Sequence, residues 1–352
     1  MVIASRRSRL ARAQAEWVGT QIAARDPALK IEYRWLESEA DQMPDRPLAD
    51  AGGKGLFARA IEQAVLEEQA DLAVHSLKDL PAADGSTRAA LVLAAVPVRA
   101  DVRDCLISRG GFAGIDKLPQ GAHLGTASPR RAAQVRRLRP DVVIDLIRGN
   151  IETRLRKVLG ELTVNREQAA AGRGQGTGVR GQPDASGTLN VEPGTLNPAI
   201  PQGSPMYDAS LMAVAGLHRA GLSQYAAYPI DTSLILPAAC QGALALQCRA
   251  GDHVTLRRCV MLNDGLSAAA AHAERQIVAA LHGDCHSPIA VLAEPIDPDQ
   301  FRIRARVFSP DGRQCAEADE RAHRRDTAKL VKRILALLED RGAHQILAAA
   351  GA

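Results

Sequence analysis

The sequence predicts an α/β fold that is followed by an α+β region. In the first 160 residues, short apolar runs alternate with polar loops and helical patterns, as at residues 72–74 and 91–96. Continuous apolar runs of this length are typical of strands whose sheet is covered by helices. From about residue 263, one helical pattern precedes three strand patterns and a closing amphipathic helix, which is an order typical of α+β units.

The first hundred residues predict four strands and two helices. The strands are expected at 1–4, 31–36, 72–74 and 91–96. One helix is expected at 8–25, where Asp26-Pro27 ends it, and the other from about 56 to 69, after a glycine-rich opening at 52–55.

A second unit begins near Asp101 and repeats the order of strand, polar loop and helix. Strands are expected at 105–107 and 142–147. Ser128 is the predicted N-cap of a helix that has Pro129 at its first position, and Arg148-Gly149-Asn150 leads into another helix. Residues 161–205 are rich in Gly, Arg, Pro and Asn without periodicity, which predicts a flexible insertion. Residues 206–222 predict either a helix or a strand followed by a helix.

The C-terminal region predicts a separate unit. A helix is expected at 267–281, strands at 289–296, 301–308 and 314–322, and a closing helix at 327–338. The apolar segments 234–237 and 242–246 flank a crossing of small residues that is a candidate interdomain hinge.

Composition limits the possible classes of protein. A chain of 352 residues predicts two or three domains, and its net charge of +4 is modest. Aromatic residues make up only 3% of the chain, which argues against binding of single-stranded nucleic acid by base stacking. No segment approaches the roughly 20 apolar residues of a membrane span. The six cysteines form no C-x-x-C pair, which favours a reduced, cytoplasmic setting.

The segment from His75 to Pro81 places an acid, a base and a hydroxyl directly after a buried strand. Loops at the carboxyl end of such strands commonly carry functional groups. Asp79 is therefore a candidate catalytic carboxylate. On this segment alone, a surface ion pair with Lys78 or an arginine is an equally good interpretation.

Arginine recurs beside small and hydroxylated residues at the predicted junctions between strand and helix. The four segments are 5–8, 128–131, 148–150 and 153–154. Guanidinium groups bind carboxylates bidentately, and helix N-termini add N–H donors, so these segments would suit a ligand with several carboxylates or phosphates. The alternative is a set of solvated helix faces.

Cys285 lies in a predicted loop between a helix and a strand, and three interpretations compete. A metal site would use Cys285 with its neighbours His282, Asp284 and His286, but no second, distant cluster is present to complete it. A reactive thiolate would be helped by the adjacent histidines. From the loop alone, a buried and inert cysteine is favoured over a modified one.

Eight motifs in order along the chain resemble those of the porphobilinogen deaminase (hydroxymethylbilane synthase) family. They cover nearly the whole chain apart from the insertion: Ala4-Ser5-Arg6, Gly52-Gly53-Lys54-Gly55-Leu56-Phe57, His75 to Pro81, Gly125-Thr126 with Arg130-Arg131, Arg148-Gly149-Asn150, Ala213-Val214-Ala215-Gly216-Leu217, Gln241-Gly242-Ala243, and Cys285 with Pro288-Ile289.

The resemblance implies three domains. The first two would be α/β domains similar to type II periplasmic binding proteins, placed around a cleft. They would comprise residues 1–99 with 242–260, and residues 100–236, the latter containing the insertion at about 161–205. The third, residues 264–352, would be an α+β domain that carries Cys285.

The resemblance also implies roles for individual residues. Asp79 would be the catalytic residue, and Cys285 would hold a dipyrromethane cofactor through a thioether, with no metal. Further cofactor-binding residues would be Lys78, Arg6, Ser8, Ser76, Thr126, Ser128, Arg130, Arg131, Arg148, Asn150 and Arg154. Substrate-binding residues would be Arg6, Lys54, Arg148, Arg154, Arg219 and Gln241.

The activity that the resemblance implies is the stepwise condensation of four porphobilinogen molecules onto the primer, with release of ammonia and hydrolysis to linear hydroxymethylbilane. The enzyme would be a cytoplasmic monomer without nucleic-acid or membrane partners. An alternative is a catalytically silent, hinge-bending protein that binds polycarboxylates. One departure from the family pattern is Asp284, which replaces a glycine beside Cys285 and is expected to raise the pKa of that thiol.

Overall fold

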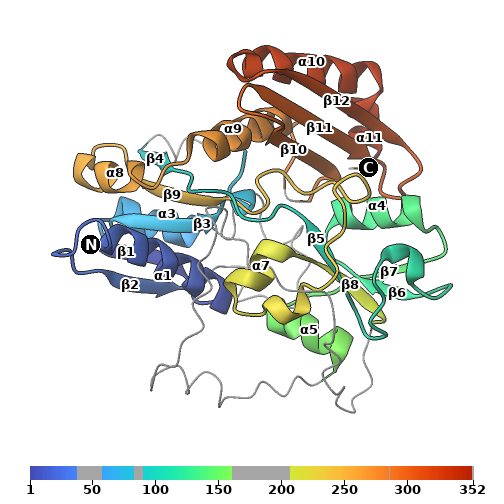
Figure 1. Cartoon of the computed structure of the whole chain (residues 1–352), viewed down its shortest axis with the longest axis horizontal. Coiled ribbons are helices and arrows are strands. Elements are labelled where there is room, and N and C mark those ends of the chain that lie inside the picture. The colour runs from blue at the N-terminus through green and yellow to red at the C-terminus, as the bar shows by residue number, and fades with distance from the viewer. Residues whose placement is uncertain (38–57, 83–89, 161–206, 285, 351–352) are drawn as a thin grey trace.

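The computed structural model describes residues 1–37, 58–82, 90–160, 207–284 and 286–350, in which the strands form three sheets (Figure 1). The predicted insertion, Lys54 and Cys285 lie outside the described residues. Helices pack against each sheet, and the predicted α/β class with a C-terminal α+β unit is confirmed. Among the described residues, no helix has the length and apolar character needed to cross a membrane.

The first sheet has five strands in the order β2-β1-β3-β9-β4. Its strands are β1 (Val2–Arg6), β2 (Glu32–Leu36), β3 (Leu72–Ser76), β4 (Leu91–Ala95) and β9 (Leu244–Arg249). Strand β9 comes from the second half of the chain and pairs antiparallel with both β3 and β4. Helices α1 (Arg9–Ala23), α3 (Arg59–Leu66) and α8 (His253–Val260) flank this sheet. Sequence analysis missed α8.

The second sheet has four strands in the order β5-β8-β6-β7. The strands are β5 (Asp104–Ser108), β6 (His123–Gly125), β7 (Val143–Asp145) and β8 (Ala209–Ala213), and the helices are α4 (Pro129–Leu138), α5 (Ile151–Leu159) and α7 (Val214–Arg219). Ser128 caps α4 by accepting from the Arg131 amide, and Asn150 caps α5 by accepting from the Thr153 amide. Both predicted helix starts are confirmed. Strand β6 was missed because three residues carry no periodicity.

The third sheet is an antiparallel meander, β10-β11-β12. It comprises β10 (Ile289–Pro295), β11 (Gln300–Phe308) and β12 (Cys315–His323), with helices α9 (Gly265–Ala280), α10 (Thr327–Asp340) and α11 (Ala343–Ala350). Alternate residues of β11, including Phe301, Ile303 and Ala305, point into a core shared with α9 and α10. The strands and α10 were predicted, whereas the short helix α11 was not.

Short 3₁₀ helices connect several elements. They are η1 (Leu77–Asp79), η3 (Ile115–Lys117), η5 (Ser223–Tyr225) and η6 (Arg324–Asp326).

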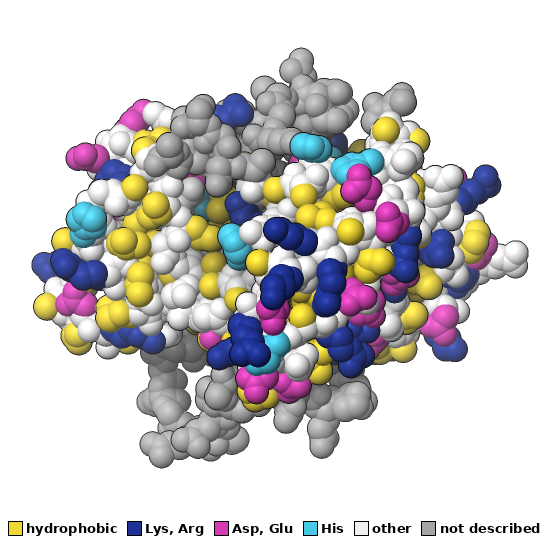
Figure 2. Space-filling model, turned by 90° about the horizontal axis from the view of Figure 1, so that it is seen from above, with side chains coloured by type: hydrophobic (Ala, Val, Ile, Leu, Met, Phe, Trp, Pro, Cys, Tyr) yellow, Lys and Arg dark blue, Asp and Glu magenta, His cyan; other side chains and the backbone are white. Residues whose placement is uncertain are grey.

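Figure 2 shows that Lys and Arg side chains on the face seen from above are interspersed with Asp and Glu side chains. This mixture differs from the single-sign basic field that typically steers a protein to nucleic acid.

A buried ion pair joins the first and third sheets. The guanidinium of Arg99, which follows β4, contacts the Glu274 carboxylate of α9 at 2.7 and 3.1 Å. Arg99 also donates through Nε to the Gln241 carbonyl at 2.8 Å, and Glu274 accepts from the Ala293 amide at 2.7 Å. Because every one of these partners is buried, the pair holds the chain crossing near Gln241 against α9.

Replacing Glu274 with Gln is expected to lower the free energy of unfolding by about 3–5 kcal/mol, because it leaves the Arg99 cation buried without its counter-charge. The matched control is Asp319→Asn, which breaks a largely exposed pair with Arg302 at 2.7 Å and should cost under about 1 kcal/mol. Urea unfolding followed by circular dichroism measures both. Equal losses in the two variants would contradict the assignment.

Candidate functional site

Asp79 lies in the turn that follows the central strand β3. The strand ends at Ser76, and the 3₁₀ helix η1 then carries Lys78 and Asp79. Leu77 anchors this turn, since its side chain is buried and its amide donates to the Ala243 carbonyl at 3.0 Å. The Asp79 carboxylate is therefore presented from a rigid base while its side chain remains partly exposed.

Two cavities meet at Asp79. The first, of about 50 Å³, lies against the first sheet, and its polar lining consists of Ser5, Arg6, Ser8, Gln14, His75, Ser76 and Asp79. Gln14 of α1 donates to Ser76 Oγ at 3.0 Å. Sequence reasoning missed Gln14, because a glutamine inside a helical pattern carries no signal by itself.

The second cavity, of about 90 Å³, lies where the elements of all three sheets meet. Its polar lining includes Lys78, Asp79, Ser128, Arg130 and Asp284. It therefore brings the turn after β3, the start of α4 and the loop after α9 to one place. Arg275 of α9, another lining residue, donates to the Leu80 and Pro81 carbonyls at 3.2 and 2.8 Å and so holds the chain just after Asp79.

Lys78 is surrounded by charged groups. Its ammonium donates to Gln241 Oε1 at 3.4 Å. Burial lowers the pKa of Lys78 to about 8, and the arginines at 130 and 131 act in the same direction, while Asp79 and Asp104 act against it. The Lys78 side chain therefore loses its proton, and its positive charge, as the pH rises through about 8.

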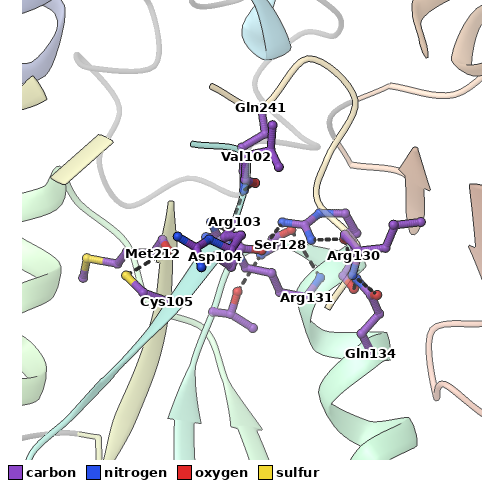
Figure 3. Close-up of polar contacts among 12 residues, drawn as sticks. Val102, Arg103, Asp104, Cys105, Ser128, Arg130, Arg131, Gln134, Met212 and Gln241 are labelled. Atoms are coloured by element: carbon purple, nitrogen blue, oxygen red, sulfur yellow. Dashed lines mark hydrogen bonds and ion pairs between the residues drawn. The ribbon is translucent and has the colours of Figure 1, made fainter. Parts of the chain in front are cut away.

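Asp104, the first residue of β5, is the centre of the polar network in Figure 3. Its carboxylate accepts from Arg130 at 2.8 Å, from Arg131 at 2.7 Å and from Gln241 at 2.9 Å. Burial alone would raise the pKa of Asp104, but the two guanidinium groups outweigh burial and hold the pKa well below its ordinary value. Sequence reasoning missed Asp104, because an Arg-Asp pair at the start of a strand resembles a surface ion pair.

Two other arginines, Arg154 and Arg219, are half-buried cations. Burial lowers the pKa of Arg219 and of Arg154 to about 10, and Arg131 adds to the effect on Arg154. Arg154 Nε donates to the Gly149 carbonyl at 2.9 Å, and Arg219 donates to the Gly242 carbonyl at 2.7 Å. Within the described ranges, neither has a carboxylate at ion-pair distance. Both are therefore suited to a carboxylate ligand.

The remaining residues that the sequence singled out are placed as follows. Ser8 caps α1 by accepting from the Ala11 amide at 3.3 Å, and Thr126 Oγ1 accepts from the Ser128 amide at 3.1 Å. Arg148 lies just before α5, where its carbonyl accepts from Lys157 at 3.2 Å. Lys54 and Cys285 lie outside the described residues.

The Asp284 carboxylate bonds to residues 286 and 287. The carboxylate of Asp284 accepts from the His286 amide at 2.9 Å and from Ser287 Oγ at 3.0 Å. These bonds hold the Asp284 side chain within its own loop, at the edge of the second cavity. In the part of the chain that the structure describes, no group of three His, Cys, Asp or Glu side chains is placed to hold a metal ion.

Comparison with known proteins gives a consistent match along the chain. Residues 1–171 and 194–257 match the family profile described as porphobilinogen deaminase, dipyromethane cofactor binding domain. Residues 268–340 match the profile described as porphobilinogen deaminase, C-terminal domain.

Individual relatives agree with these profiles. The chain is 37% identical to the porphobilinogen deaminase of Ralstonia nicotianae, with 100% of this chain and 92% of that protein covered. It is 35% identical to that of Xanthomonas euvesicatoria, with 98% of each covered. Among solved structures, a Salmonella typhimurium periplasmic binding protein superposes with a TM-score of 0.31 and 7% identity over 74% of this chain and 85% of that chain.

Proposed function

The chain belongs to the porphobilinogen deaminase family, the hydroxymethylbilane synthases of tetrapyrrole biosynthesis, and we propose that Asp79 carries its chemistry. In this proposal the enzyme joins four porphobilinogen molecules in sequence, releases ammonia at each step and hydrolyses the product to linear hydroxymethylbilane. The observation that carries the assignment is the position of Asp79 between two cavities, beside a cluster of buried cations.

The residues present fit a dipyrromethane, which carries acetate and propionate groups. Arg154 and Arg219 are half-buried cations without a carboxylate at ion-pair distance among the described residues, and Lys78 and Arg130 line the second cavity. Carboxylates would satisfy these donors. The residues that would hold the cofactor are Arg6, Ser8, Ser76, Lys78, Thr126, Ser128, Arg130, Arg131, Arg148, Asn150 and Arg154, with the thioether at Cys285.

The same cations would orient the substrate. We propose that Arg6, Lys54, Arg148, Arg154 and Arg219 contact the carboxylates of porphobilinogen. Gln241, which the resemblance also implied as a substrate contact, is buried and its amide donates to Asp104 and to the Val102 carbonyl, so it would act through Lys78 instead. When bound, the dipyrromethane supplies a free α-carbon as the nucleophile. Asp79 would then act on the substrate: its carboxylate stabilises the positive charge that develops on the pyrrole as the amine leaves, and it relays the proton at the pyrrole nitrogen.

The three sheets suggest three domains. We propose residues 1–99 with 242–260 as the first domain, 100–236 as the second and 264–352 as the third. The supporting observation is that β9 completes the first sheet between β3 and β4, whereas the second and third sheets are each built from one continuous region. We further propose a monomer in the cytoplasm. The cysteines at 105, 240, 248, 259 and 315 are free thiols, which supports the reduced setting.

Intact mass and turnover together test the proposed activity. The purified chain should be heavier than its sequence by one dipyrromethane, should colour with Ehrlich's reagent, and should convert porphobilinogen to hydroxymethylbilane with release of ammonia. An unmodified and inactive protein, obtained after expression with substrate available, would instead support a silent polycarboxylate binder.

The specificity constant kcat/KM for porphobilinogen is expected to fall as the pH rises through about 8. Lys78 is protonated below its pKa of about 8 and neutral above it, so the site loses a positive charge for substrate carboxylates as pH increases. The quantity kcat/KM reports the ionisation of the free holoenzyme. A cofactor carboxylate held by Lys78 raises the pKa of Lys78, so the decline is expected at or above pH 8. The control is Lys78→Arg, which stays charged throughout. If the decline near pH 8 persisted in that variant, another group would be responsible.

A further inference from the structure

Asp104 lies in the middle of the cationic cluster but cannot contact a ligand. Its side chain has no exposed surface, and both of its carboxylate oxygens accept hydrogen bonds from protein groups. Any effect of Asp104 on the reaction must therefore act through the residues that it holds.

Those residues come from two elements other than β5. Arg130 and Arg131 are the second and third residues of α4, and Gln241 lies in the chain crossing that leads back to the first sheet. Gln241 Nε2 donates to Asp104 and to the Val102 carbonyl at 2.8 Å, while its Oε1 accepts from Lys78. A single carboxylate thus connects the turn that carries Asp79 with the start of α4.

The hydrogen bonds to Asp104 also determine which arginine donors remain. Arg130 uses one terminal nitrogen for Asp104 and the other for the Leu236 carbonyl at 2.6 Å. Arg131 donates through Nη2 to Asp104. Among the described residues, the Nε atoms of both arginines are buried without a partner, and burial also keeps these atoms from a ligand. The cluster is therefore held in one orientation, and a ligand meets its positive charge rather than a free Nε donor.

The charges around Asp104 also favour binding of an anionic ligand beside it. Lys78, Arg130 and Arg131 bring three positive charges together, and Asp104 and Asp79 are the carboxylates that face Lys78. Asp104 is fully committed to the arginines and to Gln241, so it neutralises part of this charge without filling the cavity. The remaining positive charge is available to a ligand.

We propose that Asp104 is a positioning residue for the reaction: it holds Arg130 at the second cavity, and through Gln241 it holds Lys78 there, for the carboxylates of the pyrrole chain. The inference rests on the proposed function, since it assigns to Asp104 a role at that same site. The competing interpretation is that Asp104 only stabilises the fold by pairing two buried arginines.

Two substitutions separate these interpretations in the holoenzyme. Asp104→Asn keeps the volume but removes the charge, and its amide would face guanidinium donors. The turnover number kcat is expected to fall on the order of 100-fold, as for other displaced binding groups. The decline of kcat/KM above neutral pH should move to lower pH by roughly half a unit or more, because Lys78 loses a negative neighbour. That shift follows from the lost charge under either interpretation. A purely structural role would instead lower thermal stability and leave the kcat of the folded, cofactor-loaded enzyme unchanged.

Asp104→Glu keeps the charge but moves it by one methylene. Here kcat should fall while the alkaline decline stays near its wild-type pH. The matched control is Asp101→Asn, which removes a partly exposed carboxylate that pairs with Arg103 at 2.6 Å in the same segment. Its turnover should stay within about twofold of wild type, as expected for a surface ion pair.

Failure of the positioning role can be distinguished from failure of the proposed function, because the wild-type enzyme is measured in parallel with the Asp104 variants. An inactive wild type overturns the proposed function itself. With an active wild type, a normal kcat in folded, cofactor-loaded Asp104→Asn overturns the positioning role. If Asp104→Asn does not fold, Asp104→Glu decides by its kcat. If neither variant folds, as judged by circular dichroism, Asp104 is a structural residue only.

Discussion

Asp79→Asn is expected to lower turnover of porphobilinogen by roughly 10²–10⁴-fold while leaving the fold and the attached cofactor in place. The amide has nearly the same shape as the carboxylate but carries no negative charge and cannot accept a proton from the pyrrole nitrogen. The turn should be unaffected, because Leu77 rather than Asp79 anchors it against the first sheet.

Three measurements establish this result: kcat from product formation, intact mass for the cofactor, and thermal unfolding for the fold. The matched control is Asp116→Asn, since Asp116 is also an aspartate beside a lysine in a 3₁₀ helix but lies exposed in η3. That variant should behave like wild type. Near-normal turnover in Asp79→Asn would remove Asp79 from the catalytic role.

Cys285→Ser is expected to abolish covalent attachment of the cofactor and with it all product formation. A thioether requires a thiolate as nucleophile, and a serine hydroxyl is far too weak an acid to replace it. The flanking residues Asp284 and Ser287 line the same cavity as Asp79, so a group attached in this loop has access to the catalytic turn.

Intact mass under denaturing conditions tests the attachment directly. Cys315→Ser is the matched control, because Cys315 is a partly exposed free thiol of β12 outside the two cavities. It should keep the added mass and the activity. Retention of the added mass in Cys285→Ser would show that another cysteine carries the cofactor.

Most of the helices and strands could be predicted because the signals are local. Ser128 caps its helix as predicted, and the helix that begins after Asn150 was also predicted, since a helix start depends on the few residues that follow it. Strand β6 and helix α11 were missed because short elements are stabilised by packing rather than by their own pattern.

The candidate site was predictable in its chemistry but not in its geometry. The turn after β3 and the arginines at helix starts can be predicted as site residues, because they are acids and bases next to predicted strand ends. The role of Asp104 cannot be predicted in this way, because it depends on contacts with α4 and Gln241, which are distant from it in sequence. Gln14 and Arg275 were missed for the same reason.

The amino-acid sequence by itself determined the fold class, the helix caps, the family motifs and the identity of Asp79 and Cys285 as the residues to test. The tertiary structure decided that β9 enters the first sheet antiparallel between β3 and β4, and that one buried carboxylate joins Lys78, Gln241 and the arginines of α4. The physical reason is range: propensities and caps act between neighbours in the chain, whereas ion pairing and desolvation depend on which distant segments the fold brings together.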